Sequence, residues 1–364
     1  MKNTFGNSMA VTIFGESHGA FIGATLDGLA PGIEIDEEFI RHNLSLRRPS
    51  GKISTQRVEA DEFQIVSGVY QGKTTGTPLT VIIPNNSQHS ADYENAARAA
   101  RPGHADYTAH VKYKGYEDFR GGGHFSGRIT AALVAAGAIV IPELKKKGVN
   151  IGTHILSCGG IKDRDLEDYD RDIAMLSDME FPVLSKDSAT KIREMMEQVA
   201  SEGDSVGGIL ETVVTGLPAG LGEPWFDSVE SIISHGLFSI PAIKGVEFGD
   251  AFSMVNGRGS EYNDPLRMEK GRVVTKTNNN AGINGGITNG MPLLFRCAVK
   301  PTPSIYKKQE TIDLNSNENT ELEIKGRHDP AIIHRARIVV DSLTALVIYD
   351  ICASKFGTDY FGGH

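Results

Sequence analysis

The chain has 364 residues, of which 40% are hydrophobic, and it carries a formal net charge of -9 at pH 7. A chain of this length buries enough surface to fold without disulfides or a structural metal. The negative charge argues against non-specific binding to nucleic acid, and no run of about 18 apolar residues predicts a membrane span. The first residues, MKNTFGNSMAVTIFGESHG, lack the apolar core of a secretory signal, so we expect a soluble cytoplasmic protein.

The three cysteines, Cys158, Cys297 and Cys352, lie far apart in the chain. Their spacing matches neither a disulfide framework nor a metal site. We therefore expect buried, reduced thiols and no bound metal, as is usual in a reducing compartment.

Alternating apolar runs bounded by glycine or proline predict strands along the chain. In chain order these runs are 11–15, 63–70, 78–84, 209–216, 244–249 and 292–300. Helices are expected near 36–46, 126–147, 186–202, 227–238 and 330–355. The second and the last of these helices are too apolar for a surface position. Because consecutive strands often lack a helix between them, we predict an α+β fold in which antiparallel sheets cover a central helical layer.

Three motifs occur twice, in the same order, in the two halves of the chain. The paired segments are 15–33 and 203–221, 72–79 and 286–293, and 103–106 and 326–330. We expect a single domain over 1–364 that is built from two pseudo-repeats, about 1–150 and 200–355. In the first pair His18 aligns with Val206, so the turn does not itself require a histidine. This alignment favours a functional role for His18.

Positive charge is concentrated in the segment 101–128, which contains three histidines and five arginines or lysines in an otherwise acidic chain. It ends in GGGHFSGR, where Ser126 is expected at a helix N-cap and the helix dipole favours an anion. The order of residues is not that of a Walker nucleotide loop. The alternative is a tight glycine turn that serves packing alone.

Three other segments have the residues of an anion site. Arg47 and Arg48 follow a predicted helix, where they either bind substrate or form a solvated helix end. Lys300, together with Thr302 and Ser304, suits a phosphate monoester, although a solvated strand end has the same composition. NNNAGINGGITNG, just before that strand, contains enough glycine for a flat ligand to approach the backbone.

Proton transfer is expected from histidines and one acid near these cations. His18, His104 and His110 lie in predicted loops, and Asp329 lies in RHDP, where it either transfers a proton or forms an ion pair. A histidine with a pKa near 6.5 protonates a leaving phosphate efficiently at neutral pH. The residues alone indicate phosphate elimination or transfer and do not distinguish the two.

The chain resembles the chorismate synthase family in five segments, which occur in the family's order and cover nearly its whole length. They are GESHGAFIGATLDG, RPGHADYT, GGGHFSGRITAALVAAGAI, NNAGINGGITNGMPLLFRCAVKPTPSI and GRHDPAIIHRARIVVDSL. The resemblance implies a shikimate-pathway lyase that eliminates phosphate and a ring proton from 5-enolpyruvylshikimate 3-phosphate, in an anti-1,4 sense, to give chorismate.

The same resemblance implies a cofactor and an oligomeric state. It implies reduced FMN (FMNH2) without net redox change, a homotetramer, and a β-α-β sandwich of duplicated halves. NADP is associated with this chemistry, but no Gly-x-Gly-x-x-Gly fingerprint follows a strand, which favours an external reductant for the flavin. We expect neither nucleic acid nor a membrane among the partners.

Roles for individual residues also follow from the resemblance. His18 resembles the histidine that protonates the leaving phosphate, and His104 the one that stabilises reduced flavin by proton donation. Asp329 matches the acid that helps to remove a proton from flavin N5. The implied substrate-binding residues are Arg47, Arg48 and Arg128, and the implied FMN contacts are His124, Phe125, Ser126, Pro241, Ala242, Gly285, Lys300, Pro301, Thr302, Pro303, Ser304 and Arg327.

Departures from the family pattern and rival functions bear on these assignments. GGGHFSGR stands where GGGRSSAR is common, which concerns the flavin contacts at His124 and Phe125. One rival is a non-catalytic protein that binds a flavin or a phosphometabolite, and the presence of His18, His104 and Asp329 together disfavours it. The other rival is a phosphate lyase without flavin, which omission of the cofactor would distinguish.

Overall fold

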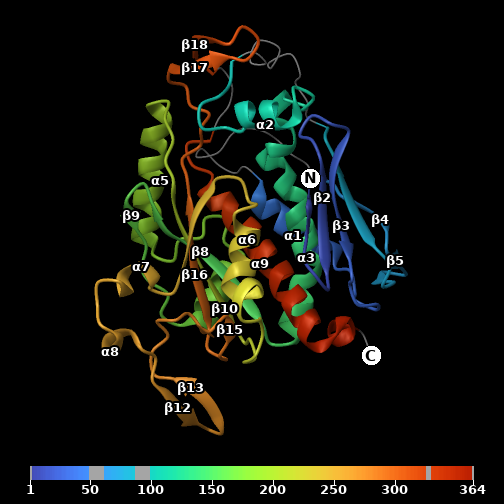
Figure 1. Ribbon diagram of the computed structural model, residues 1–364, viewed down its shortest axis with the longest axis vertical. Coiled ribbons are helices and arrows are strands. Elements are labelled where there is room, and N and C mark those ends of the chain that lie inside the picture. The colour runs from blue at the N-terminus through green and yellow to red at the C-terminus, as the bar shows by residue number, and fades with distance from the viewer. Residues whose placement is uncertain (1, 49–60, 87–98, 325–328, 363–364) are drawn as a thin grey trace.

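The computed structural model describes residues 2–48, 61–86, 99–324 and 329–362, in which two five-stranded antiparallel sheets enclose a layer of long helices (Figure 1). The first sheet has the order β1-β2-β3-β7-β4 and the second β11-β16-β10-β8-β9. Their strands are β1 (Thr4–Phe5), β2 (Ala10–Gly15), β3 (Phe21–Asp27), β4 (Gln64–Ser67), β7 (Leu79–Pro84), β8 (Asn150–Cys158), β9 (Ile161–Lys162), β10 (Gly208–Thr215), β11 (Ile243–Phe248) and β16 (Leu293–Val299).

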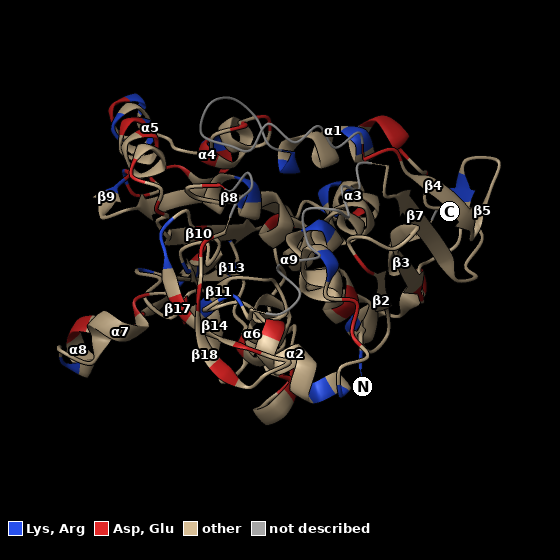
Figure 2. Cartoon of the chain, turned by 90° about the horizontal axis from the view of Figure 1, so that it is seen from above, with Lys and Arg blue, Asp and Glu red and all other residues tan. Residues whose placement is uncertain are grey.

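Helices and short hairpins complete the fold. The α-helices are α1 (Glu37–Arg47), α2 (Asp106–Tyr113), α3 (Thr130–Lys146), α4 (Tyr169–Leu176), α5 (Lys186–Ser201), α6 (Val229–Leu237), α7 (Ala251–Met254), α8 (Gly259–Tyr262) and α9 (Ile333–Phe356). The hairpins are β5–β6 (Val69–Tyr70, Lys73–Thr74), β12–β13 (Leu266–Glu269, Arg272–Thr275), β14–β15 (Ile283–Asn284, Ile287–Thr288) and β17–β18 (Gln309–Asp313, Glu318–Leu322). Acidic and basic residues are interspersed along α5, an outer helix (Figure 2).

The middle layer consists of α3 and α9, whose side chains are buried over most of their length. The two helices meet closely at Gly137, where a Cβ would overlap the backbone and Cβ of Ser342. The segment 127–146 has a mean hydropathy of 1.5 and is long enough to cross a membrane, but 72% of this window is buried inside the protein. The expectation that no stretch has this composition was therefore wrong, and burial between two sheets explains the apolar character.

The two halves share one order of elements. In the first half the sheet order β2-β3-β7-β4 is accompanied by α1 and by the central helix α3. In the second half the order β8-β10-β16-β11 is accompanied by α6 and by the central helix α9. α1 packs against α3 and α6 against α9. This correspondence supports the proposal of two pseudo-repeats and places the start of the second at β8.

Most of the predicted elements are present, and the differences have physical causes. The predicted strands and the five predicted helices are confirmed within a few residues. β8 was missed because it is buried on both faces and therefore does not alternate. His110 was expected in a loop but lies on α2, a short helix that ends at a left-handed Lys114. The three cysteines are free and buried, as expected.

The acidic segment 162–172, whose order the sequence left open, is folded. Asp163 accepts hydrogen bonds from the backbone N–H groups of Leu184 (2.6 Å) and Ser185 (2.9 Å). Asp163 also accepts from His154 on β8, at 3.2 Å, and the other ring nitrogen of His154 lies 3.2 Å from Glu211 on β10. Burial alone would lower the pKa of His154, but the hydrogen bonds to the two carboxylates raise it above its usual value.

The buried His154 predicts a pH-dependent stability. Because the folded pKa is raised above the unfolded value of 6.5, the stabilisation is fully present below pH 6.5 and is lost as the pH rises through the folded pKa. We expect His154→Gln to lower the free energy of unfolding by about 2 kcal/mol at pH 6, and the difference from the parent to shrink toward pH 9. Urea unfolding at several pH values measures this, with the exposed His235→Gln as the control. A difference that stays constant with pH would contradict it.

Candidate active site

His18 lies in the turn between β2 and β3 and is only 5% exposed. The Ser17 hydroxyl lies 3.1 Å from His18 Nδ1 and 3.1 Å from the carbonyl oxygen of Arg120. Because the carbonyl can only accept, the Ser17 proton points to it, and Nδ1–H of His18 donates to the Ser17 oxygen. Ser17 therefore sets the tautomer and the orientation of the His18 ring.

The triple glycine Gly121–Gly123 separates His18 from a second histidine. All three residues have left-handed backbone angles, with φ values of 59°, 88° and 52°. A Cβ on the first would overlap the His18 ring, and a Cβ on the second would lie 3.0 Å from Cε1 of His104. A Cβ on the third would overlap the carbonyl of Asp118. Only glycine allows this backbone to lie between the two imidazole rings.

His104 is oriented by a carboxylate. Its Nδ1 lies 2.8 Å from Asp106 Oδ1, and Arg101 donates to both oxygens of Asp106 at 2.7 Å. Burial alone would raise the pKa of Asp106, but the hydrogen bonds from Arg101 and His104 hold it well below its usual value. The ionised carboxylate only accepts, so Nδ1–H of His104 donates to it, and Nε2 is the nitrogen that faces proton exchange.

The segment 300–304 follows β16 and lies against the His104 loop. Lys300 Nζ contacts the carbonyl of Gly103, and a Cβ on Gly103 would lie 3.4 Å from Cβ of Pro303. The backbone N–H of Lys300 donates to the carbonyl of Ala242 at 2.9 Å. Ala242 itself has a φ of 74°, which is strained for a residue with a side chain. The predicted cofactor residues 241–242 and 300–304 are thus brought together beside His104.

The turn 203–206 in the second half of the chain corresponds to the His18 turn in the first half. This supporting turn contacts the cofactor segment 300–304. Ser205 Oγ donates to the carbonyl of Thr302 at 2.7 Å, and Asp204 pairs with Lys307 at 2.6 Å. The hydroxyl of Thr302 is buried and has no hydrogen-bond partner among the described residues. A buried polar group without a partner is costly, so this hydroxyl fits a ligand oxygen.

Asp329 reaches the same region through the backbone. Val206 N–H donates to the carbonyl of Pro330 at 2.8 Å, which places the start of α9 beside the supporting turn. The carboxylate of Asp329 is 9% exposed and pairs with Arg335. The ion pair weighed from the sequence is therefore present.

Three arginines converge on one buried carboxylate. Asp61, whose side chain is fully buried, lies 3.0 Å from Arg47 and 3.8 Å from Arg48, and its other oxygen contacts Arg128. The structure therefore brings together the three predicted substrate-binding cations, which are far apart in the sequence. Guanidinium groups held in fixed positions in this way suit an anionic substrate.

The known proteins to which this chain is similar belong to one family. The family model described as chorismate synthase matches residues 9–353. Chorismate synthases of Korarchaeum cryptofilum and Parabacteroides distasonis are each 44% identical, over 95% and 96% of this chain and 96% and 97% of theirs. A crystal structure of chorismate synthase superposes with a TM-score of 0.76 at 28% identity, covering 98% of this chain and 94% of that one.

The chain belongs to the chorismate synthase family. Its activity is that of a lyase of the shikimate pathway, and membership implies a flavin cofactor. The superposition also confirms the predicted fold class, in which antiparallel sheets flank central helices.

Two chorismate synthase positions with unusual residues lie at the start of α3. His124 Nδ1 donates to the carbonyl of Gly15 at 2.7 Å, which ties the triple glycine to the end of β2. The ring of Phe125 packs edge to face with Tyr113 at 6.2 Å. Ser126 is the N-cap of the 3-10 turn that leads into α3, as expected. Both departures from the family pattern are thus accommodated by local packing.

Gly285 is the predicted cofactor residue that does not join the cluster. It lies at the tip of the β14–β15 hairpin, and Gly282 at the base packs against the carbonyl of Pro292, before β16. Lys300 follows the other end of β16, about 20 Å away at 3.3 Å per residue. Figure 1 accordingly has β15 at the lower end of the second sheet and α2 at the top. Arg327 lies outside the described residues.

Several residues of the site were not predicted. They are the partners of predicted residues: Ser17 on His18, Asp106 on His104 with Arg101 bound to Asp106, and Asp61 and Asn85 on Arg128. Ser17 and Asp106 had a local signal, since each lies within two residues of its histidine. Asp61 and Asn85 had none, because they reach Arg128 through tertiary contacts.

The Asp106 carboxylate predicts a test of how His104 is oriented. We expect Asp106→Asn to lower kcat by about 10² because an amide allows the wrong tautomer of His104. The pH–rate profile of the variant should also differ in shape from that of the parent, since the His104 imidazolium loses the Asp106 carboxylate as its counter-ion. Steady-state kinetics measures both, with Asp187→Asn as the control because Asp187 forms an exposed pair with Lys191 on α5. An unchanged kcat in Asp106→Asn would contradict this role.

Proposed function

We propose that the chain eliminates phosphate and a ring proton from 5-enolpyruvylshikimate 3-phosphate, in an anti-1,4 sense, and that it requires reduced FMN without net redox change. The observation that carries the proposal is the approach of His18 and His104 to the consecutive glycines Gly121 and Gly122. Two oriented imidazoles beside a cluster of cations suit a reaction that expels phosphate.

The three proton-transferring groups have different tasks in this proposal. His18, which donates to Ser17 through Nδ1, protonates the departing phosphate. His104, which Asp106 orients, donates a proton from Nε2 to the reduced cofactor. Asp329, which pairs with Arg335, accepts a proton. Each group contributes about 10² to 10⁴ in rate.

The residues present fit a flavin mononucleotide. The free hydroxyl of Thr302 and the ammonium of Lys300 suit its phosphate, and the strained Ala242 exposes backbone beside them. The residues that would hold the cofactor are His124, Phe125, Ser126, Pro241, Ala242, Lys300, Pro301, Thr302, Pro303, Ser304 and Arg327. When bound, reduced FMN supplies electron density to the substrate ring as phosphate leaves.

Arg47, Arg48 and Arg128 bind the phosphate and carboxylates of the substrate in this proposal. Asp61 already holds their guanidinium groups in place, so little side-chain entropy is lost when substrate binds. Three guanidinium groups also suit a substrate with several negative charges.

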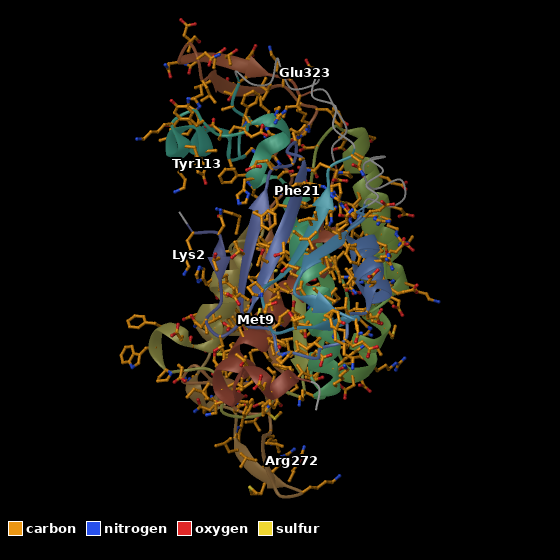
Figure 3. All side chains as sticks on the ribbon, turned by 90° about the vertical axis from the view of Figure 1, so that its right-hand side faces the viewer. Lys2, Met9, Phe21, Tyr113, Arg272 and Glu323 are labelled. Carbon is orange, nitrogen blue, oxygen red and sulfur yellow. The ribbon has the colours of Figure 1, made fainter. Side chains whose placement is uncertain are left out.

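We further propose a homotetramer in the cytoplasm, with an external reductant for the flavin and no part played by nucleic acid. The outer face of the first sheet has no helix over it among the described residues (Figure 3). Phe21 and Val66 on that sheet are 45% and 56% exposed, which favours contact with another copy. Gly285, at the far end of the second sheet, would join a flavin site only across an interface between copies. The free cysteines agree with a reducing compartment.

An anaerobic assay with 5-enolpyruvylshikimate 3-phosphate tests the reaction. We expect chorismate and phosphate in equal amounts with reduced FMN, and no product with oxidised FMN or without flavin. His18→Ala and His104→Ala should bind substrate and lose most of the turnover, by about 10² or more. Turnover without flavin would favour the flavin-independent lyase, and binding without turnover would favour the non-catalytic alternative.

Thr302 allows a sharper test of the cofactor segment. We expect Thr302→Val to weaken FMN binding by about 5- to 30-fold, because a hydrogen bond to the phosphate is lost. Its thermal unfolding should not fall, because the hydroxyl has no partner to lose within the described protein. Flavin fluorescence titration and calorimetry measure the two effects. Lys300→Ala should weaken FMN binding further, and unchanged affinity in both variants would contradict the assignment.

A further inference from the structure

Asn85 follows the last residue of β7 and lies beside the turn that contains His18. Its backbone N–H donates to the carbonyl of Ala20 at 3.1 Å, so the chain stays paired with the start of β3. The side chain is half-buried and points along the end of the sheet, toward both the turn and the start of α3.

The Asn85 side chain makes three hydrogen bonds to two parts of the site. Its Nδ2 donates to the carbonyl of Glu16 at 3.0 Å and to the carbonyl of Gly19 at 2.9 Å. Its Oδ1 accepts from Nε of Arg128 at 3.1 Å. Carbonyls only accept and a guanidinium only donates, so this network permits a single orientation of the amide.

These bonds hold the backbone on both sides of His18. Gly19 N–H donates to the carbonyl of Glu16 at 3.0 Å and closes the turn, and Asn85 binds the two carbonyls at its ends. A shift of Asn85 would therefore move the whole turn, including the Ser17 hydroxyl that orients the His18 ring.

The same side chain fixes one edge of the Arg128 guanidinium. The other nitrogens of Arg128 contact Asp61 and the carbonyl of Pro84, at 3.3 Å for the latter. Asp61 and Pro84 hold the arginine in place, but within the described parts of the chain neither forms a hydrogen bond to the His18 turn. Asn85 is the described residue whose side chain bonds to both the turn and the arginine.

We propose that Asn85 is a positioning residue that fixes His18 relative to Arg128. In the reaction Asn85 fixes the distance and orientation of the proton donor His18 relative to the substrate anion that Arg128 binds. The proposal rests on the roles proposed above for His18 and Arg128. A displacement of about 1 Å between such groups costs on the order of 10² in rate.

Steady-state kinetics of Asn85→Ala with 5-enolpyruvylshikimate 3-phosphate and reduced FMN tests the proposal. We expect kcat to fall by about 10- to 100-fold and KM for the substrate to rise by about 3- to 10-fold. Asn86→Ala is the matched control, because Asn86 is the next residue, carries the same amide and is exposed. Wild-type kinetics in Asn85→Ala would overturn the proposal.

Double variants separate positioning from a general loss of structure. If Asn85 acts through its two partners, kcat of Asn85→Ala/His18→Ala equals that of His18→Ala, and KM of Asn85→Ala/Arg128→Ala equals that of Arg128→Ala. Independent, multiplicative losses in both pairs would overturn the proposal. Wild-type rates in His18→Ala or wild-type KM in Arg128→Ala would instead overturn the proposed residue roles.

Asn85→Asp serves if the alanine variant does not fold. It has the same shape and still accepts from Arg128, but it has no N–H for the carbonyls of Glu16 and Gly19. We expect its kcat to fall as far as that expected for Asn85→Ala, while its thermal unfolding stays close to that of the parent. A wild-type kcat in this variant would overturn the proposal.

Discussion

The close approach of α3 and α9 at Gly137 is the constraint on which the rest of the molecule depends. The backbone of Ser342 occupies the space of a Cβ at this glycine, so the two helices lie as near as their main chains allow. Each helix covers the inner face of one sheet, and each begins at the site, α3 after the triple glycine and α9 after Asp329. The spacing of the helices therefore also sets the spacing of the two halves of the active site.

Charge in the site is balanced by buried carboxylates close to each cation. Asp61 stands among three arginines, Asp106 between Arg101 and His104, and Asp329 beside Arg335. Each acid holds its cation or histidine in one geometry before any ligand arrives, which is the state that fast phosphate expulsion requires. The glycines do the same for the backbone, since side chains there would fill the space of the two imidazole rings.

Sequence patterns predicted those parts of the fold that depend on local periodicity. Strands such as β7 and β16 were recognised because burial on one face makes apolar residues alternate, and α3 and α9 were recognised from apolar runs too long for a strand. β8 shows no alternation, since both of its faces are covered, and its run is short. His18 and the three arginines were proposed from residue type and from the resemblance. Asp61 and Asn85 were not predicted, because the sequence around an acid or an amide near a strand end does not depend on whether an arginine contacts it in the fold.

The position of α9 also has a consequence for folding during synthesis. α9 spans Ile333–Phe356 and follows every described strand in chain order, yet it fills the centre of the sandwich. Its Asp350 accepts hydrogen bonds from the backbone of Asn7, Ser8 and Met9, so the first strands are tied to the last helix. The second sheet therefore keeps its apolar inner face uncovered during synthesis until α9 is available, whereas α3 already covers the first sheet. A chain that stops short of α9 leaves the second sheet without its helix and is a substrate for chaperones and proteases, not a smaller enzyme.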